Sequence, residues 1–342
     1  MANETKILLI YTGGTIGMVK DYESGALKAF DFDDLAKHIP ELHQLGCEID
    51  SISFDDPIDS SNMDVAHWVK IVSLIDAHYN DYDGFVVLHG SDTMSYTASA
   101  VSFMLENLGK PVIFTGSQLP IGDLRTDAKE NLITSVQIAA LKNRGRPVVQ
   151  EVGLYFEYKL LRANRTSKLN AEHFEAFSSM NHPALITSGV HLRVHSEALL
   201  TVNRRRKFKA HVKMDAHVAV LKLFPGIGES IVNGVLGIPG LKAVVMETYG
   251  AGNAPTAEWM VGALKKAQAQ GIFIANVTQC VGGSVIMGQY ETSSHLKKLQ
   301  LLNGKDITAE AALAKLMYLL GQGVSPEMMK SVFETPLRGE MQ

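Results

Sequence analysis

The chain has 342 residues, of which 46% are hydrophobic and 20% are charged, a composition typical of a soluble globular protein. A net charge of −4 and a sequence pI of about 6.3 argue against nucleic acid or an anionic membrane surface as the main partner. Cys47 and Cys280 are far apart and offer no zinc-ligand spacing, so we expect free thiols, a reducing compartment and no metal.

The N-terminal region does not have the pattern of a signal peptide, because its apolar run covers only residues 7–11 and follows Glu4 and Lys6. No run approaches the roughly 18 apolar residues of a membrane helix. We therefore expect a cytoplasmic protein without a membrane partner.

β-branched apolar runs alternate with helical patterns along most of the chain. In the first helical pattern, residues 64–79, Trp68, Val72, Ile75 and Tyr79 form one apolar stripe. The alternation predicts βαβ units and mainly parallel sheets, and hence an α/β fold. The predicted strands are 7–11, 85–89, 112–115, 152–156, 218–223, 243–247 and 272–277, and the other predicted helices are 93–108, 256–270 and one around 313–320.

The length exceeds one typical hydrophobic core, so we expect two domains. The strand–helix rhythm breaks at 193–216, where residues 204–207 read Arg-Arg-Arg-Lys. A run of four cations is more often a solvated loop than a nucleic-acid patch. We predict a larger N-terminal α/β domain over 1–200, with a mainly parallel sheet and flanking helices. A linker or surface hairpin over 201–215 and a smaller C-terminal α/β domain over 216–342 would follow it.

Two predicted strands end in glycine-containing turns that present a hydroxyl group. TGGTIG (12–17) follows the first strand and carries Thr15, and HGSDT (89–93) follows the second and carries Ser91. Taken alone, TGGTIG also fits a helix cap or an anion-binding turn, although it lacks the Walker lysine and the GxGxxG spacing. Together the two turns predict one hydroxyl-nucleophile site at the carboxyl edge of a parallel sheet.

A hydroxyl nucleophile needs a neighbouring base. His89 lies close by in sequence, although a histidine at a strand end is more often structural. Lys168 is the other candidate, and spacing alone does not select it over the other lysines. Asp92 would either cap the following helix or orient the base and hold a substrate ammonium group.

Two more polar turns precede predicted helices, DSSN (59–62) and YGAGNAP (249–255). In the first of these turns, Ser61 or Asn62 is readily explained as the cap of the helix that follows. Four polar turns on one side of a sheet would instead form a compact pocket, which suits a small ligand better than a polymer.

These segments resemble the bacterial-type L-asparaginases, most closely their cytoplasmic type I branch. The resemblance extends over nearly the whole chain, and the pairing of the TGGTIG and HGSDTM segments is its most specific part. It implies hydrolysis of L-asparagine to L-aspartate and ammonia with no cofactor, and homodimers that associate into homotetramers with active sites at the subunit interface. The matching segments are TGGTIG (12–17), DSSNM (59–63), HGSDTM (89–94), SFMLENLGKPV (102–112), TGSQLP (115–120), NRTSK (164–168) and YGAGNAP (249–255).

The resemblance also implies roles for individual residues. Thr15 would be the nucleophile, while Ser91, Asp92 and Lys168 would form a second triad that activates water. Asp59 and Ser60 would join Asp92 in holding the substrate's α-amino and α-carboxylate groups. The remaining substrate-binding positions are Gly14, Gly90, Tyr22 and Asn253.

Three positions depart from the family's pattern. Ser91 replaces a threonine, so the methyl group that restricts χ1 is absent and we predict a functional but looser triad. The tyrosine often found on the loop after TGGTIG would align near Ala26 or Leu27, and Tyr22 is its candidate replacement on a lid over about 19–30. Glu247 occupies the position of an arginine through which some type I enzymes are activated by asparagine, so we predict that this activation is absent or altered.

Two alternative functions remain open at this point. An asparaginase-like subunit of an archaeal tRNA-dependent amidotransferase would need a partner subunit and a basic tRNA-facing surface, which the acidic pI disfavours. A non-catalytic protein that binds a small anion or amino acid would not need the full set of site hydroxyls, lysine and carboxylate. Cys280 is expected to be a buried structural thiol.

Overall fold

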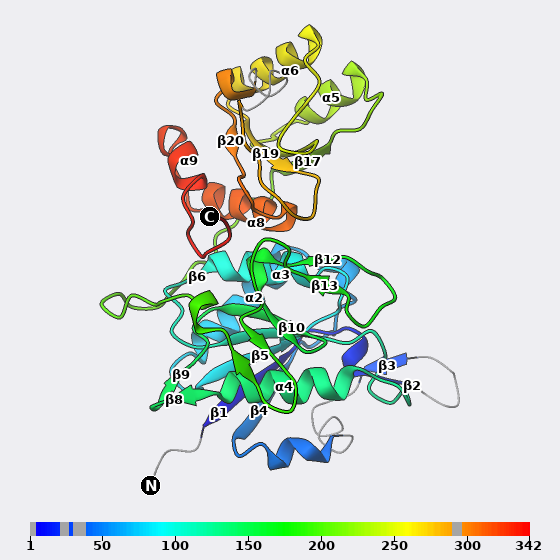
Figure 1. Ribbon diagram of the computed structural model, residues 1–342, viewed down its shortest axis with the longest axis vertical. Helices are drawn as coiled ribbons and strands as arrows, with labels where there is room; N and C mark the ends of the chain where they lie inside the picture. The colour runs from blue at the N-terminus through cyan, green and yellow to red at the C-terminus, as the bar shows by residue number, and fades with distance from the viewer. Residues whose placement is uncertain (1–4, 21–26, 30–38, 289–295) are drawn as a thin grey trace. The chain divides into compact units, whose positions relative to one another are not determined.

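The computed structural model describes residues 5–20, 27–29, 39–288 and 296–342. The chain forms two compact units, residues 1–212 and 213–342, each with its own sheet and helices (Figure 1). The predicted α/β class, with a larger N-terminal and a smaller C-terminal part, is confirmed.

The main sheet of the first unit has eight strands in the order β15-β14-β11-β10-β7-β5-β1-β4. The strands from β10 to β4 run parallel, whereas β11, β14 and β15 form an antiparallel edge. The four strands predicted for this part of the chain are all present. The strands are β1 (Lys6–Tyr11), β4 (Glu48–Ser53), β5 (Gly84–Leu88), β7 (Val112–Thr115), β10 (Val152–Phe156), β11 (Lys159–Arg162), β14 (Ile186–Thr187) and β15 (Arg193–Val194).

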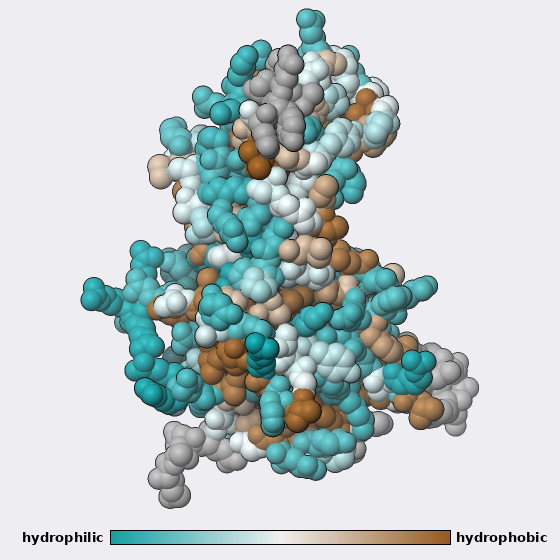
Figure 2. Space-filling model, viewed as in Figure 1, coloured by the Kyte–Doolittle hydropathy of each residue, from teal (hydrophilic) through white to brown (hydrophobic). Residues whose placement is uncertain are grey.

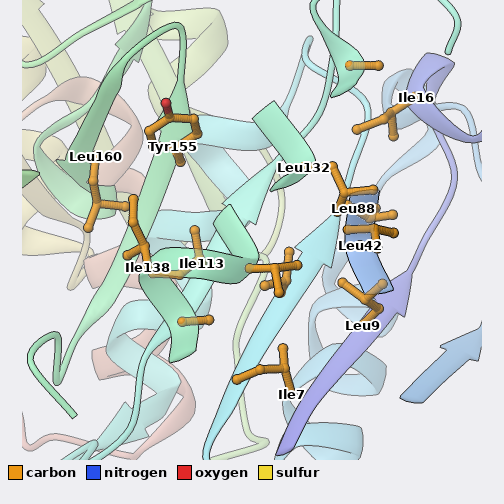
Figure 3. Packing of buried hydrophobic residues seen from close by; sticks show 14 of the residues in the cluster. Ile7, Leu9, Ile16, Leu42, Leu88, Ile113, Leu132, Ile138, Tyr155 and Leu160 are labelled. Carbon is orange, nitrogen blue, oxygen red and sulfur yellow. The ribbon is translucent and has the colours of Figure 1, made fainter. Parts of the chain in front are cut away.

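Helices cover both faces of this sheet, with α4 (Ala128–Ala140) on one face and α2 (Val65–Ala77) and α3 (Met94–Met104) on the other (Figure 1). Strand side chains alternate between the faces, so Ile7 and Leu9 of β1 and Leu88 of β5 lie on the α4 side and form one buried cluster with Leu132 of α4 (Figure 3). This buried layer holds the strands in place, and the polar turns follow directly from the ends of these strands.

Local sequence explains where these helices begin and end. The Asp64 carboxylate accepts the His67 N–H (3.1 Å), and the His67 ring accepts the Asp64 N–H (3.2 Å), so a capping box starts α2. The helix predicted over 93–108 stops earlier, at Met104, because Leu105 enters a strand and Asn107 takes a φ of 55°. Helix α4 escaped prediction because polar residues interrupt its apolar pattern, and several of these are buried.

Short elements connect the larger ones in the first unit. Strand β16 (Lys209–Ala210) pairs with β6 (Leu105–Glu106), and the four cations of residues 204–207 lie exposed just before it. They therefore form a solvated loop on the first unit. The remaining short elements are η1 (Thr15–Gly17), β2 (Met18–Lys20), β3 (Leu27–Ala29), η2 (Pro40–Gln44), η3 (Ser60–Asn62), β8 (Lys142–Asn143), β9 (Arg146–Pro147), η4 (Ala163–Arg165), β12 (Ser167–Lys168), β13 (Phe177–Ser178) and η5 (Ser196–Ala198).

The second unit has a four-stranded parallel sheet in the order β17-β18-β19-β20. Helices α5 and α6 lie on one side of it and α8 on the other (Figure 1). The strands predicted at 218–223, 243–247 and 272–277 and both predicted helices are confirmed, whereas β20, α5 and α9 were not predicted. The elements are β17 (Val218–Lys222), α5 (Glu229–Leu236), β18 (Ala243–Thr248), α6 (Glu258–Ala269), β19 (Phe273–Thr278), β20 (Leu302–Asn303), α8 (Ala309–Gly321) and α9 (Pro326–Phe333).

Surface features bear on two further expectations. Across the described residues, no helix is long and apolar enough to cross a membrane, and hydrophilic side chains predominate on the face drawn in Figure 2. Cys47 and Cys280 are not joined by a disulfide, and the prediction that Cys280 is buried is wrong. Cys280 lies in the loop after β19, where its N–H donates to the Thr278 hydroxyl (3.0 Å) and its thiol is left exposed.

Candidate active site

The first polar turn is tied to the end of the neighbouring strand. Strands β1 and β5 are parallel, so the turns that follow them leave the same edge of the sheet. Thr12 donates both its N–H and its hydroxyl to the Leu88 carbonyl, each at 3.0 Å. This places the segment that leads into Thr15 beside the segment that leads into Ser91.

The three turns that carry Thr15, Ser91 and Ser60 meet at two glycines. Gly14 has a φ of +90°, and a Cβ atom there would lie 2.4 Å from the Gly90 nitrogen. A Cβ atom at Gly90 would in turn lie 2.6 Å from the Ser60 hydroxyl oxygen. The Thr93 hydroxyl donates to the Ser60 carbonyl (2.7 Å), which holds the third turn in place. The Thr15 segment is therefore packed backbone to backbone against the Ser91 segment, and the Ser60 side chain packs against the backbone of Gly90.

Thr15 is the first residue of η1 and is half-buried. Its hydroxyl makes no hydrogen bond within the described part of the chain. A hydroxyl in a fixed turn and without an internal partner can bond a ligand, which is the requirement for a nucleophile.

Ser91, Asp92 and Lys168 form a hydrogen-bonded group. The Lys168 ammonium donates to the Ser91 hydroxyl oxygen at 2.9 Å and to the Asp92 carboxylate at 2.6 Å. The pairing of β12 with β13 holds the backbone of Lys168 in position. The Lys168 side chain is 15% exposed, whereas the Asp92 side chain is 69% exposed. The fold thus brings Lys168 to Ser91, a choice among the lysines that sequence spacing alone could not make.

His89, the alternative base, is fully buried and beyond the reach of a ligand. Its Nδ1 lies 2.7 Å from the Gly90 carbonyl oxygen, so this nitrogen carries the proton and donates it. Burial lowers the pKa of His89 to about 4, which keeps the ring neutral at pH 7. The structural interpretation of this histidine is therefore the correct one.

The turn at residues 59–62 presents a carboxylate at the same edge. Asp59 accepts the Ser61 N–H (2.9 Å) and the Ser61 hydroxyl (2.7 Å), which makes it the cap of η3. These hydrogen bonds lower the pKa of Asp59, so its exposed carboxylate stays ionised. Ser60 is buried next to Gly90. Capping and ligand binding are compatible here because the carboxylate has lone pairs to spare.

Three further predicted positions come from other parts of the sequence. Tyr22 lies outside the described residues, as do residues 21–26 and 30 of the predicted lid. Asn253 belongs to the second unit, where its backbone exchanges hydrogen bonds with Tyr249 (2.9 and 2.8 Å). Glu247, on β18, forms an ion pair with Lys222 (3.2 Å). Within the described ranges, no three His, Cys, Asp or Glu side chains are grouped so as to hold a metal ion.

Sequence reasoning missed Gln118, which follows β7 at this edge of the sheet. Its side-chain oxygen accepts the Ser91 hydroxyl (3.2 Å), and its side-chain nitrogen donates to the Ala171 and His173 carbonyls (3.3 and 3.1 Å). The TGSQLP segment supported the family resemblance but was given no role. Its position directly after a third parallel strand was the signal that could have identified it.

Known proteins resemble this chain over nearly its full length. Residues 6–200 match the family model described as "Asparaginase, N-terminal", and residues 217–333 match "Glutaminase/Asparaginase C-terminal domain". L-asparaginase 1 of Escherichia coli is 40% identical, covering 98% of this chain and 97% of its own length. The 60 kDa lysophospholipase of Mus musculus is also 40% identical over 100% of the chain, which spans 63% of that protein. The crystal structure of L-asparaginase I from Vibrio cholerae has a TM-score of 0.90 at 39% identity, with 99% of both chains covered.

Proposed function

The chain belongs to the asparaginase family, and we propose that it hydrolyses L-asparagine to L-aspartate and ammonia. The observation that carries this proposal is that the Lys168 ammonium is hydrogen-bonded to both Ser91 and Asp92. The turn that bears Ser91 and Asp92 packs against the turn that bears Thr15. A free hydroxyl beside a second hydroxyl–lysine–carboxylate group supports a two-step acyl transfer.

In the first step, the Thr15 oxygen attacks the carbon of the side-chain amide. The C–O bond forms as the carbonyl π electrons move onto oxygen, and collapse of this oxyanion breaks the C–N bond. The hydroxyl proton ends on the departing nitrogen, which leaves as ammonia. Backbone N–H groups near Gly14 and Gly90 are the candidate oxyanion donors, each worth about 3–4 kcal/mol in other enzymes.

In the second step, water attacks the ester formed on Thr15. Its oxygen bonds to the acyl carbon, the bond to the Thr15 oxygen breaks, and aspartate is released. The proton lost by water returns to the Thr15 oxygen, and Ser91, Lys168 and Asp92 orient the water and assist this transfer. The Lys168–Asp92 distance of 2.6 Å supports a fixed position for the ammonium throughout.

The carboxylates of Asp59 and Asp92 are suited to the α-ammonium group of the substrate. Both are exposed in the described structure, and Asp59 is kept ionised by its bonds to Ser61. The hydroxyl of Ser60 and nearby backbone N–H groups would bind the α-carboxylate. Tyr22 and Asn253 remain proposed substrate contacts by family resemblance alone.

We further propose a cytoplasmic homodimer that pairs into a homotetramer, as the family resemblance implies. Light scattering of the purified chain after size-exclusion chromatography tests this assembly. A mass of one subunit across the working concentration range would overturn it.

The deciding experiment compares ammonia release from L-asparagine and L-glutamine by the wild type and by Thr15→Ala. We expect the wild type to turn over asparagine and the variant to lose several orders of magnitude in kcat. A circular dichroism melt for both proteins separates loss of the nucleophile from loss of the fold. A folded wild type inactive on both amides would favour the binding-protein or partner-dependent alternative, and Thr15→Ala as active as the wild type would move the nucleophile elsewhere.

A further inference from the structure

Gln118 has a fixed amide orientation, because its three side-chain contacts can be satisfied in only one way. Its Nε2 group faces the carbonyl oxygens of Ala171 (3.3 Å) and His173 (3.1 Å), which accept hydrogen bonds but cannot donate them. The nitrogen must therefore lie on that side. The side-chain oxygen then points to the Ser91 hydroxyl at 3.2 Å and can only accept from it.

The backbone of Gln118 is anchored as firmly as its side chain. The buried carboxylate of Asp127 accepts the N–H of Gln118 (3.1 and 2.9 Å) and the N–H of Leu119 (3.1 Å). The Asn131 side-chain amide donates to the same carboxylate (3.2 Å) and to the Gly116 carbonyl (3.0 Å). A hydrogen-bonded chain thus runs from helix α4 through Gln118 to the site.

This arrangement fixes the direction of the Ser91 proton. A serine hydroxyl has one proton and two lone pairs, and here the proton is directed to Gln118. One lone pair receives the Lys168 ammonium at 2.9 Å. Among the described residues no further group donates to Ser91, so its second lone pair is left to accept a hydrogen bond from a molecule in the site.

We propose that Gln118 is a positioning residue that makes Ser91 a hydrogen-bond acceptor toward the attacking water. This inference rests on the proposed function, in which water cleaves the Thr15 ester in the second step. A water that donates to Ser91 keeps a lone pair available for the acyl carbon. Without Gln118, the Ser91 proton is free to turn toward the water. The water then accepts that proton with one of its two lone pairs and no longer has Ser91 as an acceptor for its own proton.

The test is a comparison of wild type with Gln118→Met, a variant of similar size that lacks the amide. Rapid-quench kinetics would follow ammonia and aspartate separately, and mass spectrometry would detect the acyl-enzyme. We expect a burst of ammonia, accumulation of acyl-enzyme and aspartate release slowed roughly fivefold, because one oriented hydrogen bond is worth about 1 kcal/mol. Hydroxylamine, a stronger nucleophile than water, should restore turnover by forming aspartyl hydroxamate.

Two further variants distinguish positioning from a general loss of structure. Gln137→Met changes an exposed glutamine of α4 and should leave both product curves as in the wild type. In a Ser91→Ala background, Gln118→Met should slow acyl-enzyme decay no further, because the residue through which it acts is gone. Wild-type product curves for Gln118→Met, or an equal additional slowing in the Ser91→Ala background, would overturn the inference. Absence of ammonia release from the wild type would instead reject the proposed function.

Discussion

The backbone of Gly14 lies against the backbone of Gly90, so closely that a Cβ atom at residue 14 would stand 2.4 Å from the Gly90 nitrogen. The turn that carries Thr15 is therefore held beside the turn that carries Ser91 because neither glycine has a side chain. The absence of a side chain at Gly14 and Gly90 is therefore a structural requirement for bringing the two hydroxyl-bearing turns together.

Replacing Gly14 with alanine should destabilise the fold and remove activity. The added methyl group meets the backbone of a buried strand end, and the φ of +90° is strained for any L-residue. Together these effects should lower the free energy of unfolding by about 3 kcal/mol. Urea unfolding gives this value, and ammonia release from the fraction that remains folded gives the loss of activity.

Gly46 provides the matched control for Gly14→Ala. It also has a positive φ, +64°, but no atom lies within 4 Å of the position of its Cβ. Gly46→Ala should therefore cost only the backbone strain, about 1 kcal/mol, and should leave the activity unchanged. Equal losses of stability in the two variants would mean that strain, and not the contact with Gly90, determines the effect.

Ser91→Thr should increase the rate of ammonia release about two- to fivefold. The restored methyl group restricts χ1, so less rotational freedom is lost when the hydroxyl is held between Lys168 and Gln118. Steady-state kinetics on L-asparagine measures the change. Kinetics identical to those of the wild type would show that these two contacts already fix the hydroxyl and that the triad is not loose.

The strands that build the sheets were predictable from sequence for a physical reason. β1, β5, β7 and β10 are parallel strands buried on both faces, and such strands appear as continuous apolar runs. Helix α4 was not predictable in this way because it buries Asn131 and Ser135, whose hydrogen bonds exist only in the folded chain. β4 was missed because its side chains are exposed or half-buried, so it has no apolar run.

The candidate site was predictable only up to its turns. Local sequence indicates a hydroxyl after a glycine, as at Thr15 and Ser91, but contains nothing about long-range partners. Lys168 lies 77 residues after Ser91 in sequence, and its selection depends on the pairing of β12 with β13. Gln118 acts through an amide whose orientation is set by two loop carbonyls, a feature for which no sequence pattern exists.

His89 should make the folded state less stable as the pH falls. Its pKa is lowered to about 4 by burial, against 6.5 for a free histidine, so the unfolded chain binds a proton that the folded chain rejects. The resulting loss of stability is absent above pH 6.5 and develops as the pH decreases from 6.5 to about 4. It should reach about 2 kcal/mol at pH 5. Urea unfolding at pH 5 and pH 7.5 gives the free energies needed.

His89→Gln isolates this term because other groups titrate over the same range. Burial, together with the charges of Asp127, Glu130 and Glu175, raises the pKa of Glu157 to about 7. That carboxyl has the opposite effect, since it lowers stability as the pH rises from about 4.5 to 7. At each pH, subtracting the free energy of unfolding of His89→Gln from that of the wild type removes the contribution of Glu157. If this difference does not change with pH, His89 is not the group responsible.

The rate of ammonia release should depend hyperbolically on asparagine concentration. Glu247 stands where some type I enzymes carry an arginine for an activating asparagine, and its carboxylate is paired with Lys222 at 3.2 Å. A carboxylate repels the carboxylate of an amino acid, whereas a guanidinium binds it in a bidentate manner. We therefore expect a Hill coefficient close to 1, measured from initial rates well below and well above KM.

Two variants test whether residue 247 itself determines this behaviour. Glu247→Gln removes the charge and the pair with Lys222 without supplying a guanidinium, so the curve should stay hyperbolic. Because Lys222 is 66% exposed, this change should cost less than about 1 kcal/mol of stability. Glu247→Arg supplies a guanidinium at this position. A sigmoidal curve in this variant alone would show that the residue at position 247 determines whether asparagine activates the enzyme. Sigmoidal kinetics in the wild type would contradict the prediction, because an effector site would then operate with a carboxylate at this position.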